Sequence, residues 1–438
     1  MDDLGRCYAR YQGYAMTYGL IDGNCFYCSC ERVFRPFLKG KALISLSNND
    51  GCVISRTDEA KAMGIKMGQP WFEIKHLEEK GLMALSSNFA LYGDMSDRMM
   101  SVISRFSPRQ EIYSIDESFA DFSGITEDLS AYSQKIRAAV LRETGIPTCV
   151  GIGATKTLAK LANHIAKKQP SWSGVCDLTQ LDRYQLADIM KNIEVGEVWG
   201  IGRRIAKRLN ELGIYTVFDL ARMKPEAARA EFSIVVGKTV QELRGISRID
   251  LEEVADPKKQ IISSRSFGLP MTDLAGLQSA LSEFVAIACN KLRGQNSVAA
   301  SMQIFIRTSP FDKGKQYGNS RLVTPPYPTA DNLVFTKHAL KALDAIWRPG
   351  FKYKKAGVML MDISPADAVQ GELFPVEPEH GKRAQLMVAL DGINARYGRG
   401  SVKTGSIGFH DREHWYMRQE RKSQGYTTNW DEVLIARA

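Results

Sequence analysis

Tyr113-Ser114-Ile115-Asp116-Glu117 is a short, mostly apolar run that ends in two carboxylates, and Leu20-Ile21-Asp22 ends in a third. The alternation of residue types around Tyr113 predicts a half-buried β-strand. Carboxylates at the tips of two strands can hold two divalent cations. Two such ions, about 3.5–4 Å apart, clamp the attacking and leaving oxygens of a phosphoryl transfer. The two stretches therefore favour a nucleotidyl transferase over simple surface charge.

An aromatic pair, Phe26-Tyr27, follows soon after Asp22, with Gly23 between them. Gly23 lets the backbone approach a bound ion or phosphate closely. A ring at this place could lie under the sugar of a nucleotide and collide with a ribose 2′-hydroxyl, which would select deoxynucleotides. The alternative is a pair of core aromatics at the start of a helix.

Two glycine-containing segments have features of phosphate contacts. The segment 151–162 runs from an apolar strand through small residues into a helix, so free N–H groups, the helix dipole, Lys156 and Lys160 could attract an anion. It lacks the spacing of a Walker loop. Val198-Trp199-Gly200-Ile201-Gly202-Arg203-Arg204 predicts a helix–hairpin–helix that offers backbone N–H groups to a DNA phosphate. A solvated lysine face and a glycine-capped helix corner are the alternatives.

The length of 438 residues suggests about three domains, and the net charge of +9 suits contact with phosphates. Residues 260–360 hold 13 Lys and Arg against 5 Asp and Glu, which predicts salt-sensitive contact with phosphates. We find no apolar run long enough to span a membrane and no signal-peptide core. The 8 cysteines suggest small buried residues in a reducing cytoplasm rather than a zinc site.

These motifs, in this order, resemble those of the Y-family translesion DNA polymerases. The UmuC-like branch is the nearer match, because of Phe34-Arg35-Pro36, the segment 46–53 and the segment 198–204. The resemblance runs from about residue 17 to the C-terminus. We interpret residues 1–15 as an over-extended start or a disordered arm.

The resemblance implies an α+β, multidomain, right-hand polymerase with a ferredoxin-like palm, small fingers, a helical thumb and an α+β little finger that grips duplex DNA. The expected parts are an N-terminal extension (1–16), palm (17–26 and 88–180), fingers (27–87), thumb with the helix–hairpin–helix (181–250), linker (251–260), little finger (261–364) and a clamp-binding motif with a helical tail (365–438).

The resemblance also assigns roles to residues. Asp22, Asp116 and Glu117 are the implied catalytic residues and would hold two Mg²⁺ ions, with the Gly23 carbonyl as a further ligand. The other implied contacts are Tyr27 as steric gate with Phe26 beside it, Ser55, Lys61 and Lys160 at the triphosphate, and Gly200, Gly202, Arg203 and Arg204 at DNA. Asp58 stands where some members have a tyrosine, and we expect it to point away from the phosphates.

The implied substrates are primer–template DNA and dNTPs, and the implied setting is the SOS response to DNA damage. Gln370-Gly371-Glu372-Leu373-Phe374 resembles the peptide that binds the bacterial sliding clamp, through Gln370, Leu373 and Phe374. A processed UmuD-type dimer and a RecA filament are further implied partners. The tail, with Arg412, Trp415, Tyr416 and Arg418, is a candidate surface for such proteins.

The same acidic residues distinguish a polymerase from three rival classes of protein. A GGDEF-type cyclase would need glycines before its acidic pair, and a reverse transcriptase would have paired aspartates. A catalytically inactive DNA-binding scaffold of the same fold is the alternative outside enzymes, and intact Asp22, Asp116 and Glu117 argue against it. Small fingers and no second acidic constellation for proofreading predict low fidelity.

Overall fold

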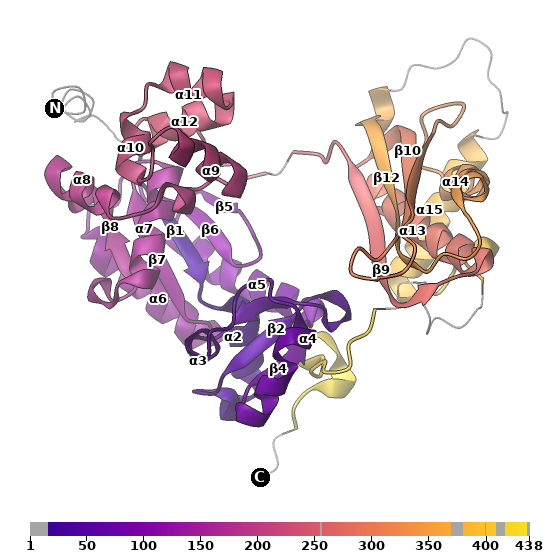
Figure 1. Cartoon of the computed structure of the whole chain (residues 1–438), viewed down its shortest axis with the longest axis horizontal. Helices are drawn as coiled ribbons and strands as arrows, with labels where there is room; N and C mark the ends of the chain where they lie inside the picture. The colour runs from indigo at the N-terminus through magenta and orange to yellow at the C-terminus, as the bar shows by residue number, and fades with distance from the viewer. Residues whose placement is uncertain (1–15, 255, 369–379, 399, 409–416, 436–438) are drawn as a thin grey trace. The chain divides into compact units, whose positions relative to one another are not determined.

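The computed structural model describes residues 16–254, 256–368, 380–398, 400–408 and 417–435 (Figure 1). The chain divides into two compact units, one of Met1–Leu46, Cys52–Ala255 and Arg421–Ala438 and one of Ser47–Gly51 and Asp256–Glu420. The expectations for residues 1–15, for the clamp motif at 370–374 and for Arg412, Trp415 and Tyr416 fall outside the described residues. Within the described ranges, no helix is long and apolar enough to cross a membrane.

The first unit is built on a sheet with the strand order β5-β6-β1-β7-β8. Strand β1 lies at its centre and pairs antiparallel with β6 and β7, whereas β7 and β8 are parallel. Every residue of β1 is buried, as expected of a strand covered on both faces. The strands are β1 (Tyr18–Gly23), β5 (Gln110–Ile112), β6 (Glu117–Asp121), β7 (Thr148–Gly153) and β8 (Val175–Asp177).

Helices cover both faces of this sheet. Val150 and Ile152 of β7 pack into one core with α5 (Phe89–Ile103) and α6 (Leu129–Thr144). Gly151 alternates with them and faces α7 (Lys156–Lys168), where an added Cβ would lie 2.1 Å from the backbone N of Asn163. The glycine is therefore needed because α7 lies directly against the strand.

The expected strand through Tyr113 is wrong in its position. Strand β5 ends at Ile112 and β6 begins at Glu117, so residues 113–116 form the turn between them. The amide groups of Tyr113 and Ser114 both donate to the carbonyl of Glu117, at 3.0 and 3.1 Å. The Ser114 hydroxyl also donates to Asp116 Oδ1 at 2.7 Å, and such local bonding to a short polar side chain favours a turn over a strand.

A small module follows β1 and has a sheet and a core of its own. Its strand order is β3-β2-β4, with β2 and β3 antiparallel and β2 and β4 parallel. Ile44, Leu46 and Val53 are buried at its centre. Its elements are α2 (Phe26–Phe34), β2 (Leu43–Leu46), β3 (Val53–Arg56), α3 (Asp58–Ala62), α4 (Trp71–Ile74) and β4 (Met83–Ser86).

A group of short helices covers residues 183–243. Capping boxes start two of them: Asp182 with Gln185 before α8, and Thr216 with Asp219 before α10. These caps explain why such short helices begin where they do. The helices are α8 (Arg183–Lys191), α9 (Arg203–Glu211), α10 (Val217–Arg222), α11 (Pro225–Glu231) and α12 (Ile234–Leu243).

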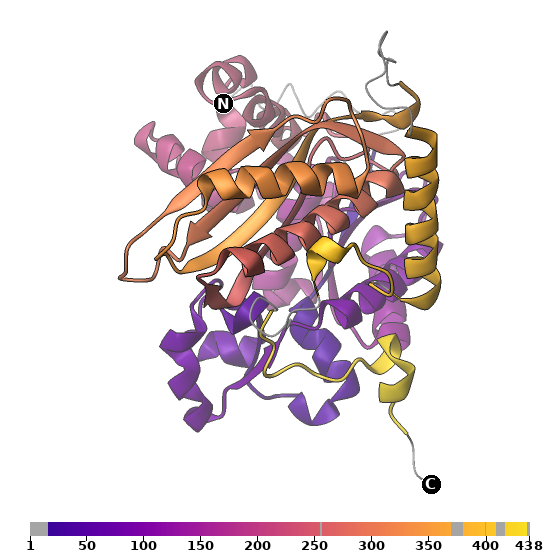
Figure 2. The ribbon, with the colours of Figure 1, turned by 90° about the vertical axis from the view of Figure 1, so that its right-hand side faces the viewer.

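The second unit has a sheet with the order β11-β10-β12-β9, in which all pairings are antiparallel. Figure 2 shows helices α13 and α14 running across one face of this sheet. Alternate residues of β10 and β12, such as Ile304, Ile306 and Val358, are buried in the core shared with these helices. The elements are β9 (Ile261–Met271), α13 (Leu274–Gly294), β10 (Ser297–Thr308), β11 (Gly318–Val323), α14 (Asn332–Ile346) and β12 (Tyr353–Pro365).

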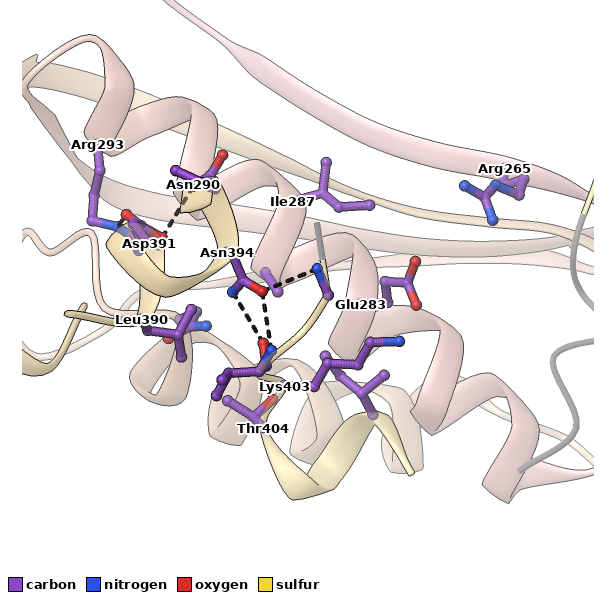
Figure 3. Close-up of a pocket in the computed structure, with 16 residues that line it drawn as sticks. Arg265, Glu283, Ile287, Asn290, Arg293, Leu390, Asp391, Asn394, Lys403 and Thr404 are labelled. Atoms are coloured by element: carbon purple, nitrogen blue, oxygen red, sulfur yellow. Dashed lines mark hydrogen bonds and ion pairs between the residues drawn. The ribbon is translucent and has the colours of Figure 1, made fainter. Parts of the chain in front are cut away.

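Helix α15 (His380–Tyr397) lies beside α13 in the same unit (Figure 3). Asp391 accepts hydrogen bonds from Arg293, at 2.6 and 2.7 Å, and from Asn290 at 3.0 Å. A cavity of about 560 Å³ lies between α13, α15 and residues 400–407. The expectation of a helical tail is therefore correct for α15.

The same expectation is wrong for residues 417–435, whose only helical turns are the short 3₁₀ turns Tyr426–Thr428 and Trp430–Glu432. Asn429, the one residue between the two turns, has an extended backbone conformation. From Arg421 onward the segment belongs to the first unit.

Candidate active site

The register of β1 and β6 brings the predicted carboxylates together. Asp22 and Glu117 are direct cross-strand partners, and directly opposed residues lie on the same face of a sheet. The amide of Gly23 donates to the carbonyl of Asp116 at 2.8 Å, which holds the turn residue against the end of β1. The three acids therefore meet at one end of the two central strands, although Asp116 reaches this end from the turn.

Two lysines of α7 accompany the acids. Lys160 Nζ lies 3.1 Å from Glu117 Oε1, and Lys167 Nζ lies 2.5 Å from Asp22 Oδ2. Residues seven apart lie two turns along one face of a helix, so α7 presents both ammonium groups to the carboxylates. Sequence reasoning found Lys160 and missed Lys167, although this spacing from Lys160 was a usable signal.

The surroundings of Asp22 favour a positive charge beside it, because its ionised carboxylate is buried and lies near two other acids. Burial raises the pKa of Asp22 to about 7, against the lowering effect of Lys167, and the charges of Glu117 and Asp116 raise it further. A divalent cation would offset both the burial and the repulsion, and carboxylates are the hard oxygen ligands that Mg²⁺ prefers.

Within the residues described, no group of three or more His, Cys, Asp or Glu side chains is arranged to hold a metal ion. The carboxylates of Asp22 and Glu117 are turned to Lys167 and Lys160 instead. The donor set thus suits a hard cation in kind, whereas the described side-chain positions are those of ion pairs with the two lysines.

The aromatic pair divides between two environments. Phe26 is buried in the core with Met99 and Ile146, which argues against contact between its side chain and a nucleotide. Tyr27 is half-buried, and its ring stacks on Tyr92 with centroids 4.6 Å apart and meets Phe89 edge-on at 6.1 Å. Phe26 therefore matches the core-aromatic alternative, and the role of Tyr27 at the sugar of a nucleotide stays a prediction.

Ser55 and Lys61 come from the small module. Ser55 is buried on β3, and its hydroxyl accepts a hydrogen bond from the amide of Cys28 at 3.5 Å. Lys61 Nζ lies 3.6 Å from the sulfur of Cys25, just before α2, and 2.7 Å from Asp58 Oδ1. Asp58 and Lys61 are neighbours on one helix face and form an exposed ion pair, and the expectation that Asp58 points away from the phosphates stays a prediction.

The start of α7 is not a free anion site. Thr155 caps the helix through the amide of Leu158, and the carboxylate of Glu242 accepts from the amide of Thr157 at 3.1 Å. Lys156 is buried and paired with Glu111 at 2.5 Å. The glycines before α7 serve helix packing, and of the two predicted lysines only Lys160 faces the carboxylates.

The Gly200-Ile201-Gly202 turn has the expected form. Gly200 adopts φ +86°, which disfavours other residues, and Gly202 is the N-cap of α9. Ile201 is buried, whereas Arg203 and Arg204 are exposed in the first turn of α9. The turn therefore presents a helix N-terminus with two adjacent cations.

Comparison with known proteins shows which family this chain belongs to. The impB/mucB/samB family model matches residues 21–164, and the model of its C-terminal domain matches 258–373. Protein UmuC of Salmonella typhimurium is 44% identical over 422 residues, which cover 95% of this chain and 99% of that protein. The chain belongs to the impB/mucB/samB family. The resemblance inferred from the motifs is thereby confirmed.

Other members and neighbours agree with this placement. Protein ImpB of Salmonella typhimurium is 42% identical over 96% of this chain and 99% of its own length. A DNA polymerase IV from Pelotomaculum thermopropionicum is 30% identical over 87% of this chain and 93% of its own length. A Y-family DNA polymerase chimera of solved structure has a TM-score of 0.63 and 21% identity, covering 80% of this chain and all of that one, which confirms the right-hand polymerase fold.

Two further models match this impB/mucB/samB family member outside the main domains. A helix–hairpin–helix motif of the family matches residues 186–214, which confirms the motif predicted at Gly200-Ile201-Gly202. A domain of unknown function matches residues 384–436 and so includes α15 from Ala384 onward and the segment from Arg421.

Proposed function

We propose that this chain is a template-directed DNA polymerase of the Y family that performs translesion synthesis in the SOS response, without proofreading. The observation that carries the proposal is the meeting of Asp22, Asp116 and Glu117 at the ends of β1 and β6, with Lys160 beside them. Membership of the impB/mucB/samB family and similarity to a DNA polymerase IV support it. A catalytically inactive scaffold of this fold is the alternative.

Asp22, Asp116, Glu117 and the carbonyl of Gly23 are the groups that would hold two Mg²⁺ ions. Such ions would supply activation of a primer 3′-hydroxyl and stabilisation of charge on the departing pyrophosphate. The chain's own residues position the substrate. Ser55, Lys61 and Lys160 are the proposed triphosphate contacts, and Lys61 supplies charge without the bidentate geometry of an arginine.

Tyr27 is the proposed steric gate. Its position on the first turn of α2 follows the Gly23 end of β1 by four residues, and its ring is fixed by stacking on Tyr92. A ring that cannot retreat would reject a ribose 2′-hydroxyl by collision. Phe26 would support the gate from the core rather than touch the nucleotide, because it is buried.

Duplex DNA is proposed to bind on the sheet face of the second unit that α13 and α14 leave uncovered. Arg307 and Lys355 are cross-strand partners there, alternating with the buried Ile306 and Ala356. Burial, and then the neighbouring charge of Arg307, lower the pKa of Lys355. A phosphate bound between these two adjacent cations would offset their mutual repulsion.

We expect Arg307→Ala with Lys355→Ala to weaken DNA binding. Each lost phosphate contact reduces the slope of log K against log salt by about 1, so the slope should fall by about 2. Fluorescence anisotropy over a salt series measures it. The matched control is Lys337→Ala with Lys341→Ala, the same loss of charge on exposed positions of α14. Equal slopes in both double variants would exclude this sheet face as the DNA-binding surface.

The sliding clamp is proposed to bind Gln370, Leu373 and Phe374. Replacing Leu373 and Phe374 by Ala should remove stimulation of synthesis by the clamp and leave basal synthesis unchanged, because apolar anchors fill the clamp pocket. Val376→Ala is the control within the same segment. Stimulation of the double variant to the parent's level would count against the motif.

Accessory partners are also proposed. A processed UmuD-type dimer and a RecA filament are favoured because the chain is similar to UmuC over nearly all its length. Template-directed incorporation of dNTPs on primed DNA, with these proteins added in parallel with the bare chain, tests the activity. Tight DNA binding with no incorporation in either reaction would favour the scaffold.

A further inference from the structure

The segment Arg421–Glu432, called here the C-terminal strap, is fastened to the first unit at several points. Arg421 forms an ion pair with Glu78, at 2.5 and 3.1 Å, and its guanidinium lies over the ring of Trp71 at 5.2 Å. Its backbone pairs with Ser86 at the end of β4: the Ser86 amide donates to the Arg421 carbonyl at 3.2 Å, and the Arg421 amide donates to the Ser86 hydroxyl at 2.9 Å. Figure 1 shows this end of the chain, in yellow, near β4 and α4.

The strap holds the C-terminal end of α2, the helix on which Tyr27 lies. The ring of Tyr426 stacks on Phe34 with centroids 4.5 Å apart and planes 9° apart. Arg35 donates through Nε to the Tyr426 hydroxyl at 2.8 Å. Tyr426 is almost wholly buried, so this is a packed contact rather than a surface touch.

The strap also holds the start of α5, the helix that carries Tyr92. The side-chain amide of Asn88 donates to the Ser423 hydroxyl at 3.0 Å and to the Gln424 carbonyl at 2.9 Å. Further along α5, Asp94 Oδ2 accepts a hydrogen bond from the Thr427 hydroxyl at 2.7 Å. Asn88 is itself buried, and a buried amide left without partners is costly.

A buried carboxylate joins these contacts to the aromatic cluster. Glu31 Oε1 accepts from the Ser423 hydroxyl and from the Tyr92 hydroxyl, both at 2.9 Å, and Glu31 is fully buried. Burial raises the pKa of Glu31, and the hydrogen bonds from Tyr92 and Ser423 oppose this. The Tyr92 ring stacks in turn on Tyr27. Ser423 is thus linked to the proposed gate through Glu31 and Tyr92.

We infer that the C-terminal strap is a positioning element for sugar selection, because Ser423 and Tyr426 tie α2, which carries Tyr27, to α5, whose Tyr92 and Phe89 rings pack against Tyr27. The inference rests on the proposed role of Tyr27 as gate. A steric gate selects only if its ring stays in place. Contacts that prevent α2 and α5 from separating therefore contribute directly to discrimination between dNTPs and rNTPs. This inference assigns a role to the C-terminal part of the domain of unknown function, because the match to that domain includes the strap.

The test uses the full chain with Ser423→Ala and, separately, Tyr426→Leu. Removing one hydrogen bond to a buried charged group changes an equilibrium by about tenfold. We therefore expect the ratio of kcat/KM for a dNTP to that for the matching rNTP to fall by about tenfold. Trp430→Ala is the matched control, because Trp430 lies in the strap and is 93% exposed. Its ratio should equal the parent's.

A purely structural role predicts a different result: incorporation of both nucleotides would fall equally and the ratio would hold, which would overturn the inference. Hydrogen exchange provides a readout without synthesis. Amides of α2 and of the first turn of α5 should exchange faster in Ser423→Ala than in Trp430→Ala, and equal exchange would also count against the strap.

A double-mutant cycle separates this inference from the proposed gate. If Ser423 acts through Tyr27, the loss of discrimination in Tyr27→Ala with Ser423→Ala should be no larger than in Tyr27→Ala alone. Additive losses would show that the strap acts elsewhere. An unchanged ratio in Tyr27→Ala alone would remove the gate itself, whereas a changed ratio there with unchanged strap variants would remove only the strap.

Discussion

Asp116→Asn should reduce nucleotide insertion by about 100-fold or more while DNA affinity stays within a few-fold of the parent's. Mutation of residues that merely support metal ligands costs about 10–100-fold, so loss of a charged ligand should cost at least the upper value. DNA affinity depends on contacts to the phosphate backbone, none of which Asp116 is proposed to make. Single-nucleotide insertion and DNA binding, measured on one preparation, check both halves.

The matched control is Asp97→Asn, the same chemical change at an exposed position of α5. It should insert nucleotides at the parent's rate. Normal turnover in Asp116→Asn would remove Asp116 from the metal site. A parallel loss of DNA affinity would indicate that the change disturbed the turn at 113–116 rather than the chemistry.

Tyr27→Ala should admit ribonucleotides. The half-buried ring of Tyr27 is braced by Tyr92 and Phe89, so in the parent it cannot yield to a 2′-hydroxyl. Relief of a clash with one small group changes selectivity on the order of 100-fold, so kcat/KM for an rNTP should rise by about that factor relative to the matching dNTP.

Steady-state insertion of dCTP and CTP opposite the same template base measures this ratio. Tyr184→Ala, which removes an exposed tyrosine from α8, should leave the ratio unchanged. Unchanged selectivity in Tyr27→Ala would place the gate at another residue. Phe26 is a poor candidate for that role because its side chain is buried.

Short motifs predicted the site because their chemistry is local. Asp22 ends a buried strand, and a helix–hairpin–helix is specified by its turn glycines, so both could be placed from the residues themselves. What these predictions share is dependence on neighbours within one turn or one strand.

The errors arose where tertiary contacts override a local pattern. Tyr113–Asp116 alternates like a strand, but hydrogen bonds to Glu117 close it into a turn. The glycines before α7 resemble a phosphate loop, yet the carboxylate of Glu242, far along the chain, accepts from the amide of Thr157 at the start of that helix. The contact of Ser423 with Glu31 joins residues 392 positions apart, and no periodicity reports such a pairing.

Primer extension opposite an abasic site, with Mg²⁺ and dNTPs, tests the central claim most directly. The parent and Asp116→Asn are compared, each as the bare chain and with a UmuD-type partner and RecA filament. The account predicts extension past the lesion by the parent and none by the variant. No extension by the parent under either condition, together with tight binding of the primed DNA, would contradict it and leave a DNA-binding scaffold.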